Sequence, residues 1–317
     1  MIPLEEIRRA RERLGDDVLR TPLVRFDGGE AWLKLENLQP VGSFKLRGAL
    51  SAIRAASRQE LEHGVVTASV GNMAQGVAWA AREAGVSARI VVPEGASAAK
   101  LEAVRRLGGE LVTVTYEEWW QSMVDRGREG VEGFFVHPSD DELVMAGNGT
   151  IGLELCEQLE SFDAVYVPWG GGGLAIGIAS AVKALRPDVR VISVEPECAA
   201  PLAASFAAGR PVDVDYEPSF VDGAGGPSLL PGTWANAREL IDEALAVPLD
   251  GTAEAMRLIA YRAHVVAEGA GALALAAARA RGGRSICMVS GGNVDAAVLA
   301  DILAGRAISK RSRRGRK

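Results

Sequence analysis

The sequence predicts an α/β protein with two open, mostly parallel sheets that are flanked by helices. The first observation is that strand-like and helix-like runs alternate along most of the 317 residues, as in proteins built from βαβ units. The second is that three predicted strands end in loops of small residues, at 67–72, 168–173 and 289–293, and each loop opens a helix. Because ligands bind outside the carboxyl ends of strands in such sheets, we expect these loops to share one site.

The composition is that of a globular protein long enough for two domains. Hydrophobic residues make up 48% and charged residues 24% of the chain, which allows a large core. The sequence contains no run of about 18 apolar residues, the length typical of a membrane helix. Glu5 and Glu6 stand where a secretory signal would be basic, and the net charge of −6 argues against nucleic acid as a partner. We therefore expect a cytoplasmic protein without a membrane or nucleic-acid partner.

Residues 1–56 predict helices around a short strand. Residues 4–14 carry apolar side chains at helical spacing, and the helix breaks at 15–17. An extended turn is predicted at 21–23 and a strand at 31–36, where apolar and polar residues alternate. Gly42 and Ser43 predict a turn and an N-cap for a helix that runs to about residue 56.

From residue 65 on, strands and helices alternate in two series. The first series predicts strands at 65–69, 89–93 and 110–115 and helices at 72–84, 98–107 and 116–128. After 134–138, the second predicts a helix at 150–159, a strand at 164–168, a helix at 174–185 and a strand at 189–194. A long loop follows at 209–233, and residues 246–249, helices at 251–264 and 270–281 and a strand at 285–289 complete the sheet. The basic residues 311–317 are expected to form a disordered tail.

The cysteines and histidines are too scattered to predict a metal site or a catalytic triad. The three cysteines are Cys156, Cys198 and Cys287, and the three histidines are His63, His137 and His264. Without a paired Cys motif, we expect buried, reduced thiols rather than a disulfide or a zinc site. Residues that are distant in sequence can still meet in a fold, so this argument applies to sequence spacing only.

Four consecutive glycines, Gly170 to Gly173, predict a phosphate-binding loop. They leave successive backbone amides uncovered before a helix, and those amides together with the helix dipole favour an anion. A tight turn alone would need only one or two glycines.

Lys45 is the best candidate nucleophile of the chain. It lies beside Phe44 at a predicted helix start, among small residues, where partial desolvation and the helix dipole both favour a neutral amine. An ordinary surface lysine in the first turn of a helix is the alternative that this segment leaves open. A reactive lysine together with a phosphate loop points to pyridoxal phosphate, whose aldehyde forms an imine with lysine.

Five segments, taken together and in this order, resemble the threonine/serine dehydratase and serine racemase group of pyridoxal phosphate enzymes, which have the tryptophan-synthase-β-like fold, fold type II. The segments are 43–49, 69–76, 170–174, 268–272 and 290–293. The resemblance covers nearly the whole chain. It implies a small domain, residues 41–136, inserted in a large domain of residues 1–40 and 137–310, with the cofactor in the cleft. A homodimer is the habit of this group.

The resemblance also implies the roles of individual residues. Lys45 would bind the cofactor as an imine, Phe44 would pack beside the ring, Asn72 would hydrogen-bond the phenolic oxygen, and Ser290 would face the pyridine nitrogen. The phosphate would be bound by Gly170, Gly171, Gly172, Gly173 and Leu174. The substrate carboxylate would be bound by Ser69, Val70, Gly71, Asn72 and Met73, at a helix N-terminus. Glu268 would be an acid near the ring, and a plain helix-start carboxylate is the alternative.

The reaction that the resemblance implies is β-elimination from L-threonine, L-serine or a related 3-hydroxy amino acid, which gives a 2-keto acid and ammonia. A serine such as Ser290 cannot stabilise a charged pyridinium as a carboxylate does, and this favours elimination over transamination. Val70 stands where the racemases have a second serine as proton donor. Leu46 stands where the sulfhydrylase and threonine synthase branches tend to have an aspartate.

Three positions depart from the pattern of the resembled group. Met73 replaces a frequent histidine and Asn148 a usual glutamine, which alters the pocket. Pro201 falls where racemases have an aspartate ligand in the divalent-cation loop that follows Glu195, so we predict no metal.

Other functional classes remain as alternatives at this point. Gly170, Gly172 and Ala175 fit the GxGxxG/A pattern of a nicotinamide dehydrogenase, with Glu195 near the place of a ribose-binding acid. That interpretation leaves the segments around Lys45 and Ser290 unexplained. A racemase, a sulfhydrylase or threonine synthase of the same fold, and a pyridoxal-phosphate-binding protein without turnover are the further alternatives.

Overall fold

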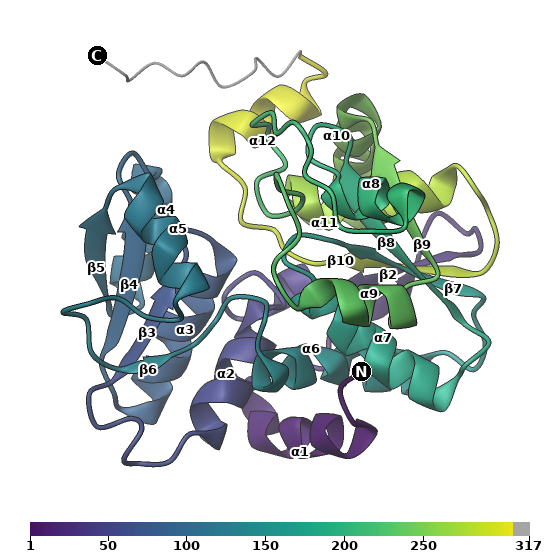
Figure 1. The fold of residues 1–317 in the computed structure, drawn as a ribbon. Coiled ribbons are helices and arrows are strands. Elements are labelled where there is room, and N and C mark those ends of the chain that lie inside the picture. Colours follow the sequence, from purple (N-terminus) through teal and green to yellow (C-terminus); the bar gives the residue numbers. More distant parts are fainter. Residues whose placement is uncertain (307–317) are drawn as a thin grey trace.

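The computed structural model describes residues 1–306, which form two sheets side by side with helices on their faces (Figure 1). The large sheet of this part of the chain has the strand order β1-β2-β10-β7-β8-β9, and the small sheet has the order β5-β4-β3-β6. Neighbouring strands are parallel, except that β1 and β2 are antiparallel. The predicted fold class is confirmed. The predicted tail, 311–317, lies outside the described residues.

The strands have the following bounds. The large sheet contains β1 (Leu23–Arg25), β2 (Ala31–Leu35), β7 (Ala164–Pro168), β8 (Arg190–Pro196), β9 (Glu243–Val247) and β10 (Ser285–Val289). The small sheet contains β3 (Val65–Ala68), β4 (Ala88–Pro93), β5 (Gly109–Val114) and β6 (Phe134–Phe135).

The helices follow the predicted alternation in most places. They are α1 (Leu4–Leu14), α2 (Lys45–Ala55), α3 (Asn72–Ala84), α4 (Ala98–Arg106), α5 (Tyr116–Val124), α6 (Glu142–Gln158), α7 (Gly173–Leu185), α8 (Pro201–Ala208), α9 (Thr233–Leu240), α10 (Leu249–Leu258), α11 (Gly269–Arg279) and α12 (Ala296–Leu303). The long loop predicted at 209–233 is confirmed between α8 and α9.

The large sheet is covered on both faces, which explains the continuous apolar run of residues 286–289 in β10. Ile286 and Met288 of β10 belong to one apolar cluster, together with residues of α6 and α7. Cys287 and Val289 point to the other face and pack with residues of α10 and α11. Side chains of a strand alternate between faces, so a strand buried on both sides has a continuous apolar sequence.

The sequence misplaced the start of α6 and the cap of α2. Asp141 caps α6 by accepting the N–H groups of Leu143 and Val144. The helix begins at Glu142, eight residues before the start that we expected at 150. The expected N-cap Ser43 is wrong, because Phe44 precedes α2 without a side-chain cap. The hydroxyl of Ser43 is buried without a hydrogen-bond partner among residues 1–306. The helix expected at 251–264 is α10 followed by a π-helical turn at Ile259–Ala263.

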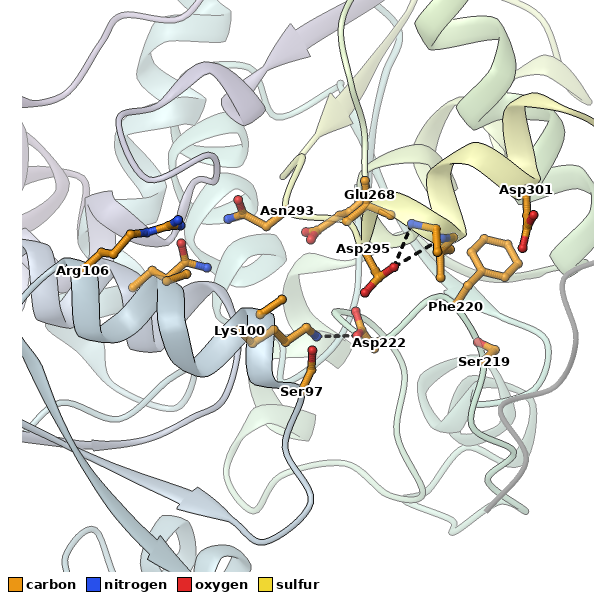
Figure 2. A pocket seen from close by; sticks show the side chains of 16 residues that line it. Ser97, Lys100, Arg106, Ser219, Phe220, Asp222, Glu268, Asn293, Asp295 and Asp301 are labelled. Carbon is orange, nitrogen blue, oxygen red and sulfur yellow. Dashed lines mark hydrogen bonds and ion pairs between the residues drawn. The ribbon is translucent and has the colours of Figure 1, made fainter. Parts of the chain in front are cut away.

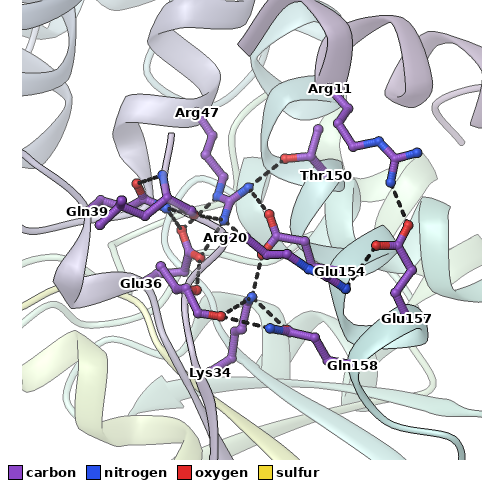
Figure 3. Close-up of polar contacts among 12 residues, drawn as sticks. Arg11, Arg20, Lys34, Glu36, Gln39, Arg47, Thr150, Glu154, Glu157 and Gln158 are labelled. Carbon is purple, nitrogen blue, oxygen red and sulfur yellow. Dashed lines mark hydrogen bonds and ion pairs between the residues drawn. The ribbon is translucent and has the colours of Figure 1, made fainter. Parts of the chain in front are cut away.

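A buried ionic cluster joins α2 to β2 and α6 (Figure 3). Arg47 binds both carboxylate oxygens of Glu36 at 2.8 Å and donates to Glu154 at 2.7 Å. Lys34 pairs with the other oxygen of Glu154. Two cations and two anions therefore neutralise one another, as buried charges require. We name Lys34, Glu36, Arg47 and Glu154 the buried ionic cluster.

The division into a small domain, 41–136, and a large domain, 1–40 with 137–310, stays a prediction. Helix α2 packs against α3 of the small sheet and equally against α6. In the described part of the chain, no helix is long and apolar enough to cross a membrane.

Candidate active site

The small-residue loops meet in one pocket between the two sheets, as the strand topology predicts. The ends of β3, β7 and β10 reach this pocket of about 300 Å³, and so does the start of α2. The segment before α2 is tied to the end of β10, since the N–H of Phe44 donates to the carbonyl of Ser290 at 3.0 Å. We call this pocket the inner pocket. All the predicted site residues line it: Phe44, Lys45, Ser69, Val70, Gly71, Asn72, Met73, Gly170, Gly171, Gly172, Gly173, Leu174, Glu268 and Ser290.

Lys45 presents a half-buried amine to the inner pocket. Its Nζ donates to the carbonyl of Pro138 at 2.5 Å and lies 5.2 Å from the centre of the Phe44 ring. Burial lowers the pKa of Lys45 to about 8, against the opposing attraction of the Glu268 carboxylate. About a tenth of this amine is therefore neutral and nucleophilic at pH 7, far more than for an ordinary lysine.

Glu268 ends a chain of hydrogen bonds that crosses the pocket. Asn72 donates to its carboxylate at 2.7 Å, and Asn293 donates to Asn72 at 2.8 Å. Glu268 is the N-cap residue of α11, but its carboxylate turns to Asn72 and makes no capping hydrogen bond in the described chain. Burial and the nearby Asp222 carboxylate raise the pKa of Glu268 to about 7, against the opposing effects of Asn72, Lys100 and Lys45.

The four glycines form a cradle that a side chain would fill. A Cβ on Gly171 would lie 2.4 Å from the Ser139 hydroxyl, and one on Gly173 would lie 2.5 Å from the Ser139 carbonyl oxygen. Gly172 has a φ of +88° and caps the N-terminus of α7. The first N–H groups of a helix have no partner within the helix, so this cradle fits the phosphate of pyridoxal phosphate.

Three of the predicted residues, Met73, Ser290 and Val70, are buried or half-buried at the edge of the pocket. Met73 is 1% exposed and packs in the apolar cluster of the small sheet, so only a small part of it faces the pocket. Ser290 is also buried, at the carboxyl end of β10. Val70 is half-buried and aliphatic.

Several lining residues were not predicted from the sequence. Pro138 and Ser139 follow β6, so the rule that sites lie at strand ends could have found them. Trp119 and Met123 of α5 gave no sequence signal. The others are Ala68, Gln75, Lys100, Pro168, Asp222, Gly223, Ala224, Gly225 and Asn293.

A second, outer pocket of about 350 Å³ adjoins the first (Figure 2). The two pockets share five lining residues: Gln75, Lys100, Asp222, Glu268 and Asn293. Lys100 of α4 pairs with Asp222 of the long loop at 2.5 Å, so this ion pair stands where the pockets meet. The long loop thus touches the helices of the small sheet from the opposite side of the cleft.

The carboxylate of Glu195, which precedes the segment that resembles a cation loop, has partners within the protein. Glu195 accepts the N–H groups of Leu202 and Ala203 at the start of α8. Burial raises the pKa of Glu195 to about 8, against those two hydrogen bonds. Among residues 1–306, no group of three or more His, Cys, Asp or Glu side chains could hold a metal ion.

Two mostly parallel sheets, a half-buried lysine at a helix start and a glycine cradle in the cleft define a pyridoxal phosphate enzyme of fold type II. The model of the pyridoxal-phosphate dependent enzyme family matches residues 14–291, and the chain belongs to this family. The L-threonine ammonia-lyase of Thermotoga maritima is 40% identical over 307 residues, which are 93% of this chain and 76% of that protein. The catabolic L-threonine dehydratase of Escherichia coli K12 is 36% identical over 312 residues, 93% and 94% of the two chains. The structure of maize serine racemase superposes with a TM-score of 0.87 at 33% identity, covering 95% of this chain and 97% of that one.

Proposed function

We propose that this protein is an ammonia-lyase that uses pyridoxal phosphate to remove ammonia from L-threonine, L-serine or a related 3-hydroxy amino acid. The observation that carries the proposal is the inner pocket, in which Lys45 with its lowered pKa, the Asn72–Glu268 pair and the glycine cradle meet. The L-threonine ammonia-lyase and dehydratase relatives, which align with most of this chain, support the same reaction.

Each part of the pocket has a role toward the cofactor. The amides of Gly170 to Leu174 would bind the phosphate, and Lys45 Nζ would bind the aldehyde carbon. Asn72 would donate to the phenolic oxygen, Phe44 would pack beside the ring, and Ser290 would accept or donate at the ring nitrogen. When bound, the cofactor supplies an electron sink for the pair left at the substrate's α-carbon.

The protein's own groups would handle the substrate and its protons. The N-terminus of α3, residues Ser69 to Met73, offers backbone N–H groups to the substrate carboxylate, with the side chain of Met73 in the core. Lys45 Nζ, once released by the incoming amino group, would take the α-proton as general base. Loss of the β-hydroxyl as water and hydrolysis of the remaining enamine then give a 2-keto acid and ammonia.

A racemase is the second candidate, because the structure of maize serine racemase is similar over nearly the whole chain. Racemisation needs a donor that returns a proton to the face opposite Lys45. The aliphatic Val70 in the substrate loop has no such proton, so elimination should dominate.

Reduction with borohydride followed by peptide mapping tests the cofactor role, and keto acid release from L-threonine and L-serine tests the reaction. We expect a yellow protein with the cofactor fixed on Lys45. A colourless protein without a modified lysine but with tight nicotinamide binding would favour the dehydrogenase alternative. Cofactor on Lys45 without keto acid release would favour a binding protein.

The proposal also includes a homodimer, as in the resembled group, and a cytoplasmic location, because the sequence has no long apolar run and has acidic residues near Met1. Light scattering of the purified protein measures the oligomeric state.

A further inference from the structure

His137 lies outside the predicted site, yet it organises a turn beside the inner pocket. It follows β6, is 4% exposed, and its Nδ1 accepts the backbone N–H groups of Ser139 at 3.1 Å and Asp140 at 2.8 Å. A ring nitrogen that accepts must be unprotonated, so the proton is on Nε2. Burial, with the charges of Arg126 and Lys45, lowers the pKa of His137 to about 4, so the ring stays neutral. We name residues 137–140 the histidine turn.

The histidine turn touches both parts of the candidate cofactor site. The carbonyl of Pro138 accepts the Lys45 amine at 2.5 Å. Ser139 packs so closely on the glycine cradle that Gly171 and Gly173 could not carry a Cβ. The Lys45 amine belongs to α2 and the glycine cradle leads into α7, and the histidine turn contacts both.

We propose that His137 is a positioning residue: by holding the N–H groups of Ser139 and Asp140, it fixes the turn that sets Lys45 Nζ relative to the glycine cradle. The inference rests on the proposed function, in which the amine and the cradle bind opposite ends of one cofactor. It adds a residue that touches neither cofactor nor substrate.

The N–H groups that His137 accepts show why an acceptor is needed at this place. Among residues 1–306, the Nδ1 of His137 is the only acceptor of the buried N–H of Ser139 and of the half-buried N–H of Asp140. If His137 were apolar, the turn would rearrange to satisfy these two groups. Such a rearrangement moves the Pro138 carbonyl and the Ser139 side chain together. A misplacement of about 1 Å at a reacting group can lower the rate about 100-fold.

The chain itself shows which substitution should preserve the turn. Asp141 accepts the N–H groups two and three residues further on, those of Leu143 and Val144, through its side-chain Oδ1. His137 makes the same pattern through Nδ1. An asparagine can place its Oδ1 in this position, so His137→Asn should conserve the turn, whereas His137→Leu removes the acceptor.

The test compares His137→Leu, His137→Asn and the control Ser205→Ala. Ser205 is buried on α8 and accepts the N–H of Val212 at 3.1 Å, away from the cleft. The measurements are the dissociation constant of pyridoxal phosphate by absorbance titration, borohydride fixation on Lys45, kcat and KM for L-threonine, and the melting temperature of the cofactor-free protein.

We expect His137→Leu to weaken cofactor binding at least about tenfold and to lower kcat about 100-fold with little change in KM. His137→Asn should restore both to within about threefold of wild type. Ser205→Ala should lower only the melting temperature. If His137→Leu does not fold, His137→Gln, which moves the acceptor by one bond, should show the same losses beside His137→Asn.

Two outcomes would overturn the inference. One is a His137→Leu protein that, like Ser205→Ala, loses only thermal stability. The other is a His137→Asn protein that binds and turns over as poorly as His137→Leu. Failure of borohydride to fix the cofactor on Lys45 in the wild-type protein would instead refute the proposed function, and this inference with it.

Discussion

At the scale of single residues, the protonation of Lys45 decides when the pocket can capture its cofactor. Burial lowers the pKa of Lys45 to about 8, and only the neutral amine attacks an aldehyde. The rate of pyridoxal phosphate capture by the cofactor-free protein should therefore rise about tenfold per pH unit below about pH 8 and level off above it. Stopped-flow absorbance measures this rate, with Lys45→Ala as the control that should not form the bond. A rate that is flat from about pH 6 to about pH 9 would contradict the lowered pKa.

Val70 should control the ratio of racemisation to elimination. Val70→Ser adds an exchangeable proton to the substrate loop, so the share of D-serine formed from L-serine should rise about tenfold or more. Val70→Ala is the matched control, since it reduces the side chain to a similar size without a hydroxyl. Chiral chromatography measures D-serine beside pyruvate. An equal D-serine share in both variants would show that the proton comes from elsewhere.

The sequence predicted the residues of the inner pocket better than their surroundings. Every predicted site residue lines the pocket, because each belongs to a motif at the end of a strand, where topology alone decides the location. The spacing of His137 predicts neither a metal site nor a catalytic triad. Its role in the turn depends on two backbone N–H groups, and a sequence pattern does not show which donor a buried acceptor meets.

At the scale of elements, the buried ionic cluster should govern how firmly α2 is held. Glu154→Gln leaves Lys34 and Arg47 with Glu36 as the remaining anion of the cluster, and we expect a loss of about 3–5 kcal/mol in the free energy of unfolding. Glu157→Gln, one turn further along α6, removes a half-exposed partner of Arg11 and should cost at most about 1 kcal/mol. Urea denaturation measures both. Equal losses in the two variants would contradict a special role of the buried cluster.

The elements that the sequence missed have weak local signals. Helix α6 contains Gly147 and Gly149, and glycine normally disfavours a helix interior, so the helical signal before residue 150 is weak. Tertiary packing overrides that preference, since a Cβ on Gly147 would lie 2.4 Å from the Arg47 carbonyl oxygen. Strand β1 has three residues, and its pairing with β2 gives no periodicity that a sequence window can detect.

At the scale of the whole molecule, the Lys100–Asp222 pair links the two sides of the cleft. The pair is partly exposed, so it is worth at most about 1 kcal/mol, or about fivefold in an equilibrium constant. Lys100→Met should raise the KM for L-threonine by up to about fivefold and change kcat little. Arg105→Met is the control on the same helix, because Arg105 pairs with Glu102 on the surface. Steady-state kinetics measure KM and kcat of both variants. An unchanged KM in Lys100→Met would show that the pair does not affect substrate binding.

The position of β10 in the large sheet sets the order in which the chain can fold during its synthesis. The strands of the small sheet lie between residues 65 and 135, so they can pair while the ribosome is still making the rest. Strand β10 stands between β2 and β7 and pairs Ser285 with Ala31. The large sheet therefore keeps a gap until residue 289 has left the ribosome, and the nascent chain exposes apolar strands that a chaperone could bind for most of its translation.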